Sequence, residues 1–306
     1  MTSPYDIEEI FPDDGVRLPR RQSGGSPQGL AVTLLADYTL RDRAWLPTGA
    51  LVALLGEAGV SHAGARATIS RLARRGVLEG SRRGRTSSYR LTVGAAAVLA
   101  AGGRVIFAPA PDHEWDRCWT LIAFTLPQGD VAGRRELRGK LRWLGCAPLY
   151  DGLWISPHDL TGEVRSQLVG PASGALTVFR ARHVDLGESV GRDPVQAWDT
   201  AAIAGRYDAF IRRWEPVRGR VGGITGAEAV RTRTEVMDTY RRLPVLDPGL
   251  PRVLLPADWP REPARELFAA LYDGLAGAAE DHVREVAGPG VRAHTVAELV
   301  AGFRVT

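Results

Sequence analysis

The stretch Ser61–Leu91, SHAGARATISRLARRGVLEGSRRGRTSSYRL, combines a short arginine-rich helix with a basic hairpin. Ser61 is the expected N-cap of the helix, and Gly76 is expected to end it. A strand that begins at Val77 then leads into the basic turn Arg82–Arg85, and a second strand returns from it. A winged helix-turn-helix has this order of elements, with one helix in the major groove of DNA and the hairpin along the phosphates. The sequence therefore predicts a DNA-binding module.

The spacing of apolar residues indicates which face of this helix is buried. Ala65, Ile69, Leu72 and Ala73 recur at i, i+4, i+7 and i+8, which makes one stripe. The opposite face carries small residues and arginine, so the backbone can lie deep in a groove while guanidinium groups reach bases or phosphates. We predict that the following side chains contact DNA, five from the helix and three from the hairpin: His62, Arg66, Ser70, Arg71, Arg74, Arg82, Arg83 and Arg85.

Charge is distributed unevenly along the chain. Residues 17–92 contain thirteen arginines and four acids, whereas residues 1–16 contain five acids and no base, and residues 93–306 contain 26 of each sign. A segment with a net charge of +9 is typical of phosphate binding. The alternative is a solvated surface that reflects composition, because Lys140 is the only lysine among 39 basic residues. The acidic start is either a solvated tail or a competitor for the same arginines.

Two further helices are expected to support the DNA-binding module. The segment 30–40 has apolar residues at helical spacing, and a second helix over 47–58 begins at Pro47, where the missing N–H costs nothing. The passage Gly59–Ser61 is the tight turn before the reading helix. These boundaries predict a disordered acidic arm over 1–27, a winged helix-turn-helix over 28–95 and a linker over 96–112.

The middle of the chain alternates strands and helices. The run Trp119–Pro127 is an apolar strand, and two short strands flank the turn pair Asp151–Gly152. With a helix before these two strands, another helix over 159–168 and a last strand over 176–184, the order is β-α-β-β-α-β. This order favours a ferredoxin-like domain over 113–190.

The remaining residues, 191–306, are expected to form a helical domain. Helices are predicted over 194–214, 226–242 and 264–279, and the passage Pro244–Pro260 is too rich in proline for a helix or a central strand. The aromatic residues of these helices are expected in the core, although some could line a ligand pocket or a dimer interface. The fold class predicted for the whole chain is α+β.

Several classes of protein are disfavoured by what the sequence lacks. No run of 18 apolar residues exists, and the N-terminus lacks the basic-then-apolar order of a signal peptide, so a cytoplasmic protein without a membrane segment is expected. Cys118 and Cys146 make no metal set and suggest a reducing compartment. The scattered His113, His158 and His183 are interpreted as surface or structural residues. We find no motif for a catalytic residue, a bound metal or a cofactor.

The chain resembles the PaaX family, the bacterial repressors of phenylacetic acid degradation. The resemblance lies in ARATISRLARRGVLEGSRRGRTSSYRLT, in WTLIAFTLP with LRGKLRWLGCAPLYDGLWISP, and in YDAFIRRW with DPGLPRVLLPADWPREPARELFAALYDGL, across about residues 28–280. It implies a winged helix, a ferredoxin-like domain similar to small CRISPR spacer-acquisition nucleases, and a helical C-terminal domain. Those nucleases need an aspartate near the end of the first strand. Here the first acid is Asp130, beyond Pro127, which disfavours nuclease activity.

The resemblance also implies a homodimer on a palindromic operator that controls aromatic catabolism. An aryl-CoA thioester, phenylacetyl-CoA in the founding branch, would release this dimer from double-stranded DNA. An effector-independent architectural DNA-binding protein is the alternative. Because an acyl-CoA needs cations for its phosphates and an apolar slot for its acyl group, we predict a pocket between the last two domains. Its predicted residues are Arg134, Arg135, Arg138, Trp143, Trp154, Trp198, Tyr207 and Trp214.

Overall fold

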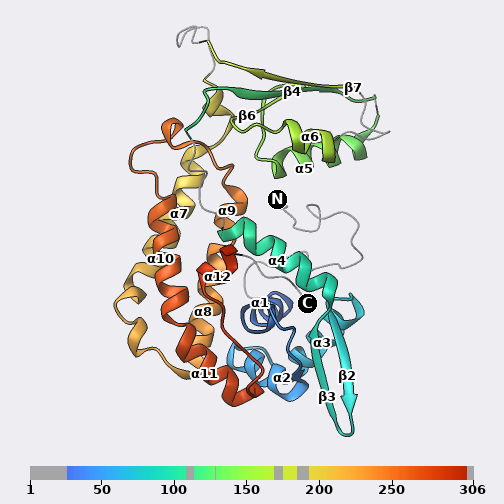
Figure 1. Ribbon diagram of the computed structural model, residues 1–306, viewed down its shortest axis with the longest axis vertical. Coiled ribbons are helices and arrows are strands. Elements are labelled where there is room, and N and C mark those ends of the chain that lie inside the picture. The colour runs from blue at the N-terminus through green and yellow to red at the C-terminus, as the bar shows by residue number, and fades with distance from the viewer. Residues whose placement is uncertain (1–25, 108–113, 128, 169–174, 185–192, 302–306) are drawn as a thin grey trace. The chain divides into compact units, whose positions relative to one another are not determined.

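The computed structural model describes residues 26–107, 114–127, 129–168, 175–184 and 193–301 (Figure 1). The described residues form two compact units. The first contains residues 26–107, 207–244 and 260–301, and the second contains residues 114–206 and 245–259. Each unit combines helices with one antiparallel sheet, which confirms the predicted α+β class.

The first unit begins with the three predicted helices, α1 (Pro27–Thr39), α2 (Thr48–Glu57) and α3 (His62–Arg74). Ser61 caps α3 as expected, because its Oγ accepts a hydrogen bond of 3.2 Å from the N–H of Gly64. Gly76 has a φ of +72°, the left-handed conformation that favours glycine after a helix. Local capping signals therefore place α3 where the sequence predicted it.

A basic hairpin follows α3 directly. Strands β2 (Leu78–Arg83) and β3 (Thr86–Leu91) pair antiparallel around a two-residue turn that contains Gly84, with a φ of +60°. The two-residue strand β1 (Leu46–Pro47) pairs with the other edge of β3, so the sheet order is β1-β3-β2. Sequence periodicity did not predict β1, because two residues are too few to show an alternation.

The packing groups the chain differently from the predicted domain boundaries. Much of the predicted linker, 96–112, belongs to helix α4 (Val93–Phe107), and Ala95, Ala96 and Ala100 are buried in the core of the first unit. The same core contains residues of α8 (Gly226–Tyr240) and α11 (Ala276–Ala287). The C-terminal helices and the N-terminal module therefore share one hydrophobic core.

The C-terminal helices also differ in their limits from those expected. The structure has the 3₁₀ helix η2 (Pro194–Ala197) and then α7 (Thr200–Arg218), where one helix was expected over 194–214. Two helices, α10 (Arg261–Gly274) and α11, replace the single helix expected over 264–279. The remaining short elements are η3 (Val221–Gly223), α9 (Arg242–Leu246), η4 (Arg252–Leu254) and α12 (Val296–Ala301).

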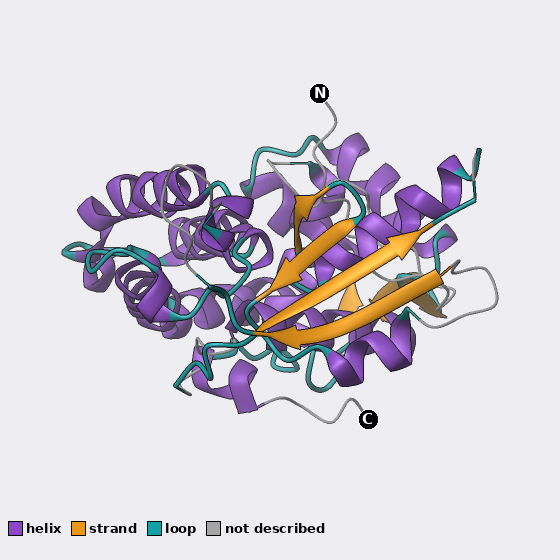
Figure 2. Cartoon of the chain, turned by 90° about the horizontal axis from the view of Figure 1, so that it is seen from above, coloured by secondary structure: helices purple, strands orange, loops and turns teal. Residues whose placement is uncertain are grey.

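The second unit contains a four-stranded sheet with helices on one face. Its elements are β4 (Trp119–Thr125), α5 (Val131–Trp143), β5 (Ala147–Tyr150), β6 (Leu153–Ser156), α6 (Thr161–Gln167) and β7 (Ala175–Ala181). The strand order is β5-β6-β4-β7, and all neighbours are antiparallel. Both helices lie on the same side of the sheet (Figure 1), and the view in Figure 2 looks at the sheet from above.

The two faces of this sheet have separate cores. Ile122 and Trp154 pack under the helices with Leu141, whereas Trp119 and Ile155 belong to a smaller cluster on the other face. The predicted acidic arm up to residue 25, the end of the predicted linker (108–112) and His113 lie outside the described residues.

Candidate nucleic-acid interface

Helix α3 has one buried face and one exposed face. Ala65, Ile69 and Leu72 are buried, as the stripe predicted, and Thr68 is buried with them. Ala73, the fourth residue of the predicted stripe, is only partly buried against the same core. The buried stripe fixes the rotation of α3 about its axis, and so determines which side chains it presents to a partner.

The helix residues predicted to contact DNA lie on or beside the exposed face of α3. The side chains of His62, Arg66, Ser70 and Arg74 are exposed. Arg71 differs from them, because it is half-buried and its Nη2 donates a hydrogen bond of 3.2 Å to Thr68 Oγ1. The structure therefore presents four of these side chains freely and holds the fifth along its own helix.

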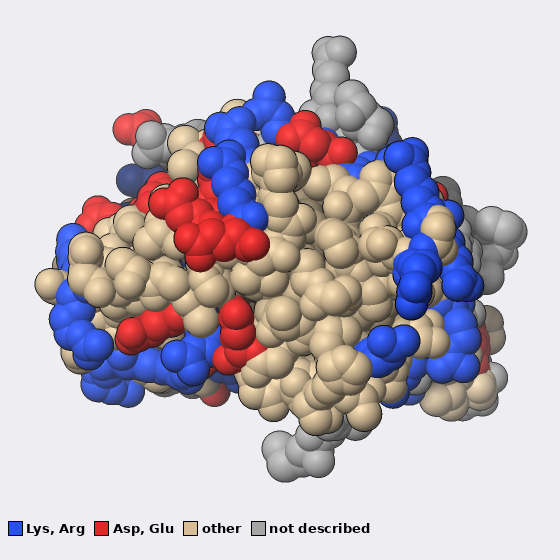
Figure 3. All heavy atoms as spheres, turned by 90° about the horizontal axis from the view of Figure 1, so that it is seen from below, with Lys and Arg blue, Asp and Glu red and all other residues tan. Residues whose placement is uncertain are grey.

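The hairpin arginines form the second part of the interface. Arg82, Arg83 and Arg85 are all exposed at the turn between β2 and β3. Arg82 Nε donates to the carbonyl oxygen of Gly84 at 3.3 Å, and the side chain remains exposed. Seen from below, one group of basic side chains lies along the right of the view beside a wide uncharged area, and other basic side chains lie beside acidic ones at the left and top (Figure 3).

The exposed arginines of α3 and the hairpin turn differ from other arginines of the same module, which form ion pairs with a carboxylate. In the same module, Arg43 and Arg90 both form ion pairs with Glu79, the latter at 2.7 Å. Across the part of the chain that the structure describes, no ion pair is found for the exposed arginines of α3 or of the hairpin turn. Their positive charge is therefore available to an external anion.

A second group of charged residues is buried inside the first unit. Arg233 of α8 has 0% exposure, and its guanidinium carbon lies 3.7 Å from the centre of the Tyr272 ring. Its Nε donates to the carbonyl oxygen of Tyr272 at 3.1 Å, and its Nη2 donates to the carbonyl oxygen of His294. The hydroxyl of Tyr272 in turn donates to Asp37 Oδ1 of α1 at 2.8 Å. This buried cluster joins the N-terminal module to the C-terminal helices.

Burial shifts the proton affinities of this cluster. Loss of solvent raises the pKa of Asp37 from 3.8 to about 6, although the charge of Arg233 and the hydrogen bond from Tyr272 oppose the shift. Burial also lowers the pKa of His294 to about 4, with a further contribution from the positive charge of Arg233. No local pattern in the sequence marks these residues as buried, so the cluster could not be predicted from the sequence.

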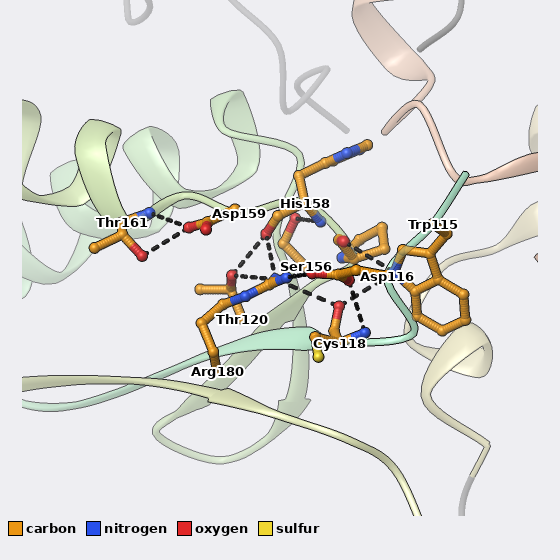
Figure 4. Close-up of polar contacts among 10 residues, drawn as sticks. Trp115, Asp116, Cys118, Thr120, Ser156, His158, Asp159, Thr161 and Arg180 are labelled. Carbon is orange, nitrogen blue, oxygen red and sulfur yellow. Dashed lines mark hydrogen bonds and ion pairs between the residues drawn. The ribbon is translucent and has the colours of Figure 1, made fainter. Parts of the chain in front are cut away.

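A polar cluster in the second unit surrounds Arg180 of β7 (Figure 4). Its Nη1 donates to the carbonyl oxygens of Cys118 and His158, each at 3.3 Å, and to Thr120 Oγ1 at 3.1 Å, while Nη2 forms an ion pair with Asp116. Hydrogen bonds from the Cys118 N–H and from Arg180 hold the pKa of Asp116 below its ordinary value. Because this guanidinium is shared among protein acceptors, it ties the start of β4 to β7.

In the described residues around Arg180, the Ser156 hydroxyl is not paired with the His158 imidazole. Ser156 Oγ accepts a hydrogen bond from the backbone N–H of His158, while the imidazole Nε2 lies 3.0 Å from the carbonyl oxygen of Pro248. At the end of β4, Asp130 caps α5 by accepting from the Gly133 N–H at 2.8 Å. Within the described residues, no group of three or more histidine, cysteine or acidic side chains could hold a metal ion.

The residues predicted to bind an effector are divided between the two units. In the second unit, Arg134 and Arg135 are exposed on α5 and Arg138 is half-buried, whereas the Trp143 side chain lies outside the described part of the structure. Trp154 is buried in the core beneath α5, and Arg142 covers its ring at 5.6 Å.

The other aromatic residues of this set are also packed against protein. Trp198 precedes α7 in extended conformation and stacks on Trp119 at 6.2 Å, a correction to its expected place on a helix face. In the first unit, Tyr207 and Trp214 are buried, and Trp214 Nε1 donates to Thr239 Oγ1 at 2.9 Å. The predicted effector site therefore stays a prediction.

Three family models match successive parts of the chain. Residues 26–95 match a model described as PaaX-like protein, residues 112–191 match the PaaX protein central Cas2-like domain, and residues 198–285 match the PaaX-like protein C-terminal domain. The chain belongs to the PaaX family. The first of these models covers α1 to β3, the part of the molecule that carries the exposed arginines.

A curated relative and a solved structure extend this PaaX assignment. The transcriptional repressor PaaX of Escherichia coli (strain K12) is 29% identical over 250 residues, which are 79% of this chain and 77% of the relative. The uncharacterized protein Rv0674 from Mycobacterium tuberculosis is similar in structure, with a TM-score of 0.60 and 22% identity over 85% of this chain and 99% of that one. The second likeness concerns the fold alone. No helix among the described residues is long and apolar enough to cross a membrane.

Proposed function

We propose that this protein is a sequence-specific DNA-binding transcriptional repressor. Helix α3 enters the major groove, and the turn between β2 and β3 contacts phosphates. The observation that carries the proposal is the set of exposed arginines without a carboxylate partner among the described residues, at positions on α3 and the hairpin turn. DNA phosphates and base edges provide the acceptors that these guanidinium groups lack.

The arrangement of elements supports a winged helix-turn-helix. The N–H of Val60 donates to the carbonyl oxygen of Leu55, so the turn between α2 and α3 is short and fixed. Helix α3 then leads through Val77 into the β2–β3 hairpin, and β1 completes a three-stranded sheet. In this arrangement the reading helix and the hairpin tip belong to one rigid module, because both connect through the buried core residues Leu72 and Leu78.

The second unit supports the ferredoxin-like assignment. Its elements occur in the order β-α-β-β-α-β, and the strand pairing places the first and third strands, β4 and β6, in the centre of the sheet. We propose this domain as a structural part of a homodimer that places two copies of α3 on a palindromic operator. This assignment gives the second unit a binding role and no catalytic one.

An effector is the remaining part of the proposal. The curated relative is named a repressor, and a repressor of a catabolic operon needs a signal that releases it from DNA. An aryl-CoA thioester fits the exposed basic side chains of α5, Arg134 and Arg135, which are suited to its phosphates. Binding that favours one arrangement of the two units over another would change the spacing of the two reading helices.

The DNA-binding part is tested by selection from a pool of random duplexes with the purified full-length protein. We expect enrichment of a two-fold symmetric sequence, and we expect the variant Arg66→Ala/Arg74→Ala to lose that enrichment while it remains folded. A matched variant, Arg206→Ala/Arg212→Ala, changes two exposed arginines outside the module and should retain the enrichment. Failure of the wild-type protein to enrich any sequence would contradict the proposal.

The effector part is tested by thermal shift against CoA thioesters and aromatic acids. A ligand that binds only the folded state adds roughly 2.7 kcal/mol of stability at a hundred times its dissociation constant. We expect a shift with at least one aryl-CoA thioester and weaker operator binding in its presence. Absence of any shift beside intact DNA binding would instead support the effector-independent architectural role.

A further inference from the structure

The exposed face of α3 is built around a row of small side chains. Ala63, Ala67 and Ser70 are exposed at i, i+4 and i+7, so they lie one above the other along the middle of this face. Arg74 continues the same row at the C-terminal end of the helix, while Arg66 lies on one flank. The part of α3 that would lie deepest in a groove therefore carries methyl groups and one hydroxyl.

The side chains on this face define which bases α3 can recognise. Arginine pairs with guanine, asparagine or glutamine with adenine, aspartate or glutamate with cytosine, and an alanine methyl group contacts the 5-methyl group of thymine. The α3 sequence, HAGARATISRLAR, has no asparagine, glutamine, aspartate or glutamate. Of the residue types that pair with adenine or cytosine, the exposed face of α3 carries serine, at Ser70. At Ala63 and Ala67 an A·T pair can be recognised only through the thymine methyl group.

The surroundings of the two alanines favour such contacts. The methyl-bearing residues of α3 larger than alanine, Thr68, Ile69 and Leu72, are all buried in the core and cannot reach a base. Along the row the neighbours of Ala67 are Ala63 and Ser70, both small, while the longer Arg66 lies on the flank, so the middle of the row can approach the base edges closely. Apolar groups are in contact when their heavy atoms come within about 4.0–4.5 Å.

We propose that Ala63 and Ala67 determine specificity by contacting thymine 5-methyl groups in each operator half-site. This inference rests on the proposed function, because it assigns a base preference to the same reading helix. It predicts that the half-site contains thymine at positions where the methyl group itself, and not the hydrogen-bonding pattern of the base pair, contributes to binding. The arginines of the helix then account for guanine.

The test replaces the methyl group and nothing else on the base. Full-length protein is first used to select duplexes from a random pool, and the enriched sequence is then synthesised with dU in place of each dT in turn. Kd is measured by fluorescence anisotropy for every duplex. At one or two positions in each half-site we expect dU to weaken binding about fourfold, the effect of exposing one buried methyl-sized group.

Matched variants identify the protein side of the contact. Ala67→Gly and Ala63→Gly remove one methyl group each, and each should bind its dT and dU duplexes equally at one position. Glycine also weakens a helix by about 1 kcal/mol, so Ala97→Gly on the exposed surface of α4 serves as the control. Ala67→Ser provides a second variant, because serine is a better helix former than glycine, and it should also lose the preference for dT.

The outcomes distinguish this inference from the proposed function. If no duplex is enriched, the proposed function fails. If a sequence is enriched but dU has no effect at any position, the repressor proposal stands and the methyl contact is wrong. A dU effect that persists unchanged in both glycine variants would assign the contact to another residue and would also overturn the inference.

Discussion

Arginine has opposite roles in two regions of the first unit. On α3 and the hairpin turn, Arg66, Arg74 and the three hairpin arginines are exposed and have no carboxylate partner among the described residues. Arg233 has 0% exposure, and its Nε and Nη2 are bonded to backbone carbonyl oxygens, with the Tyr272 ring against its face. The comparison shows that the number of arginines in a segment does not by itself indicate a binding surface. An arginine is available for recognition only where the fold leaves its charge uncompensated.

The same comparison explains why the C-terminal helices stabilise the DNA-binding module. A buried guanidinium is tolerated when nearby groups compensate its charge, because a desolvated ion costs several kcal/mol. Asp37 of α1 and Tyr272 of α10 provide this compensation for Arg233 of α8. Three elements far apart in the sequence must therefore assemble together, and α1 cannot leave the helices without exposing the network.

The largest expected effect is at Arg233. Arg233→Met keeps most of the side-chain volume but leaves Asp37 without its positive partner, so we expect a loss of about 3–5 kcal/mol in the free energy of unfolding. Urea denaturation followed by circular dichroism measures this. Arg212→Met, an exposed site on α7, is the control and should change stability by less than about 0.5 kcal/mol. Equal effects of the two variants would remove the distinction between buried and exposed arginine.

A pH titration of Asp37 gives the next largest effect. Its pKa in the folded state, about 6, lies above the ordinary 3.8, so its contribution to stability is complete below pH 4 and is lost as pH rises toward 6. The difference corresponds to about 3 kcal/mol at 1.36 kcal/mol per pKa unit. Asp37→Asn should lack this loss, so its stability relative to the wild type should rise between pH 4 and pH 6.

The wild type must be compared with Asp37→Asn because the titration of His294 changes stability with pH in the direction opposite to that of Asp37. Its lowered pKa, about 4, means that the wild type and Asp37→Asn both lose stability as pH falls below 6.5. This term is largely common to the two proteins and cancels in their difference. A constant difference between pH 4 and pH 6 would show that the carboxyl of Asp37 is not desolvated in the folded state.

A smaller effect, on DNA affinity, is expected for the arginines of α3. Arg71→Ala/Arg74→Ala should weaken binding to the selected operator by roughly 1–3 kcal/mol and relax the preference at one position in each half-site. The free energy of unfolding should change little, because Arg74 is exposed and the hydrogen bond of Arg71 is to Thr68 of the same helix. Undiminished and equally selective binding by this double variant would contradict the assignment of the reading helix.

The local features of α3 and the hairpin were predicted well from the sequence. The Ser61 cap, the buried residues Ala65, Ile69 and Leu72, and the hairpin turn at Gly84 all follow from short-range rules of capping, helical period and turn conformation. The same holds for the alternation of elements in the second unit. These features could be predicted because each depends on residues that are close together in the chain.

The buried cluster around Arg233 could not be predicted from the sequence. Asp37, Arg233 and Tyr272 are far apart, and each resembles an ordinary helix residue in its own segment. Buried carboxyl and guanidinium groups are rare, so a single sequence gives them no distinguishing pattern. The packing of the segment expected as a linker is hidden for a related reason, since Ala95, Ala96 and Ala100 of α4 are uninformative alone yet are buried in the core of the first unit.

The most direct test of the account is the salt dependence of DNA binding by a variant with a neutral hairpin. The Kd for a selected duplex is measured by anisotropy between 50 and about 200 mM salt for the wild type, for Arg82→Ala/Arg83→Ala/Arg85→Ala, and for Arg206→Ala/Arg212→Ala/Arg231→Ala as an exposed control. The slope of log K against log salt should become shallower by roughly 0.9 for each lost phosphate contact in the hairpin variant, and should stay unchanged in the control. An unchanged slope in the hairpin variant, with its fold intact, would contradict the claim that this surface binds DNA.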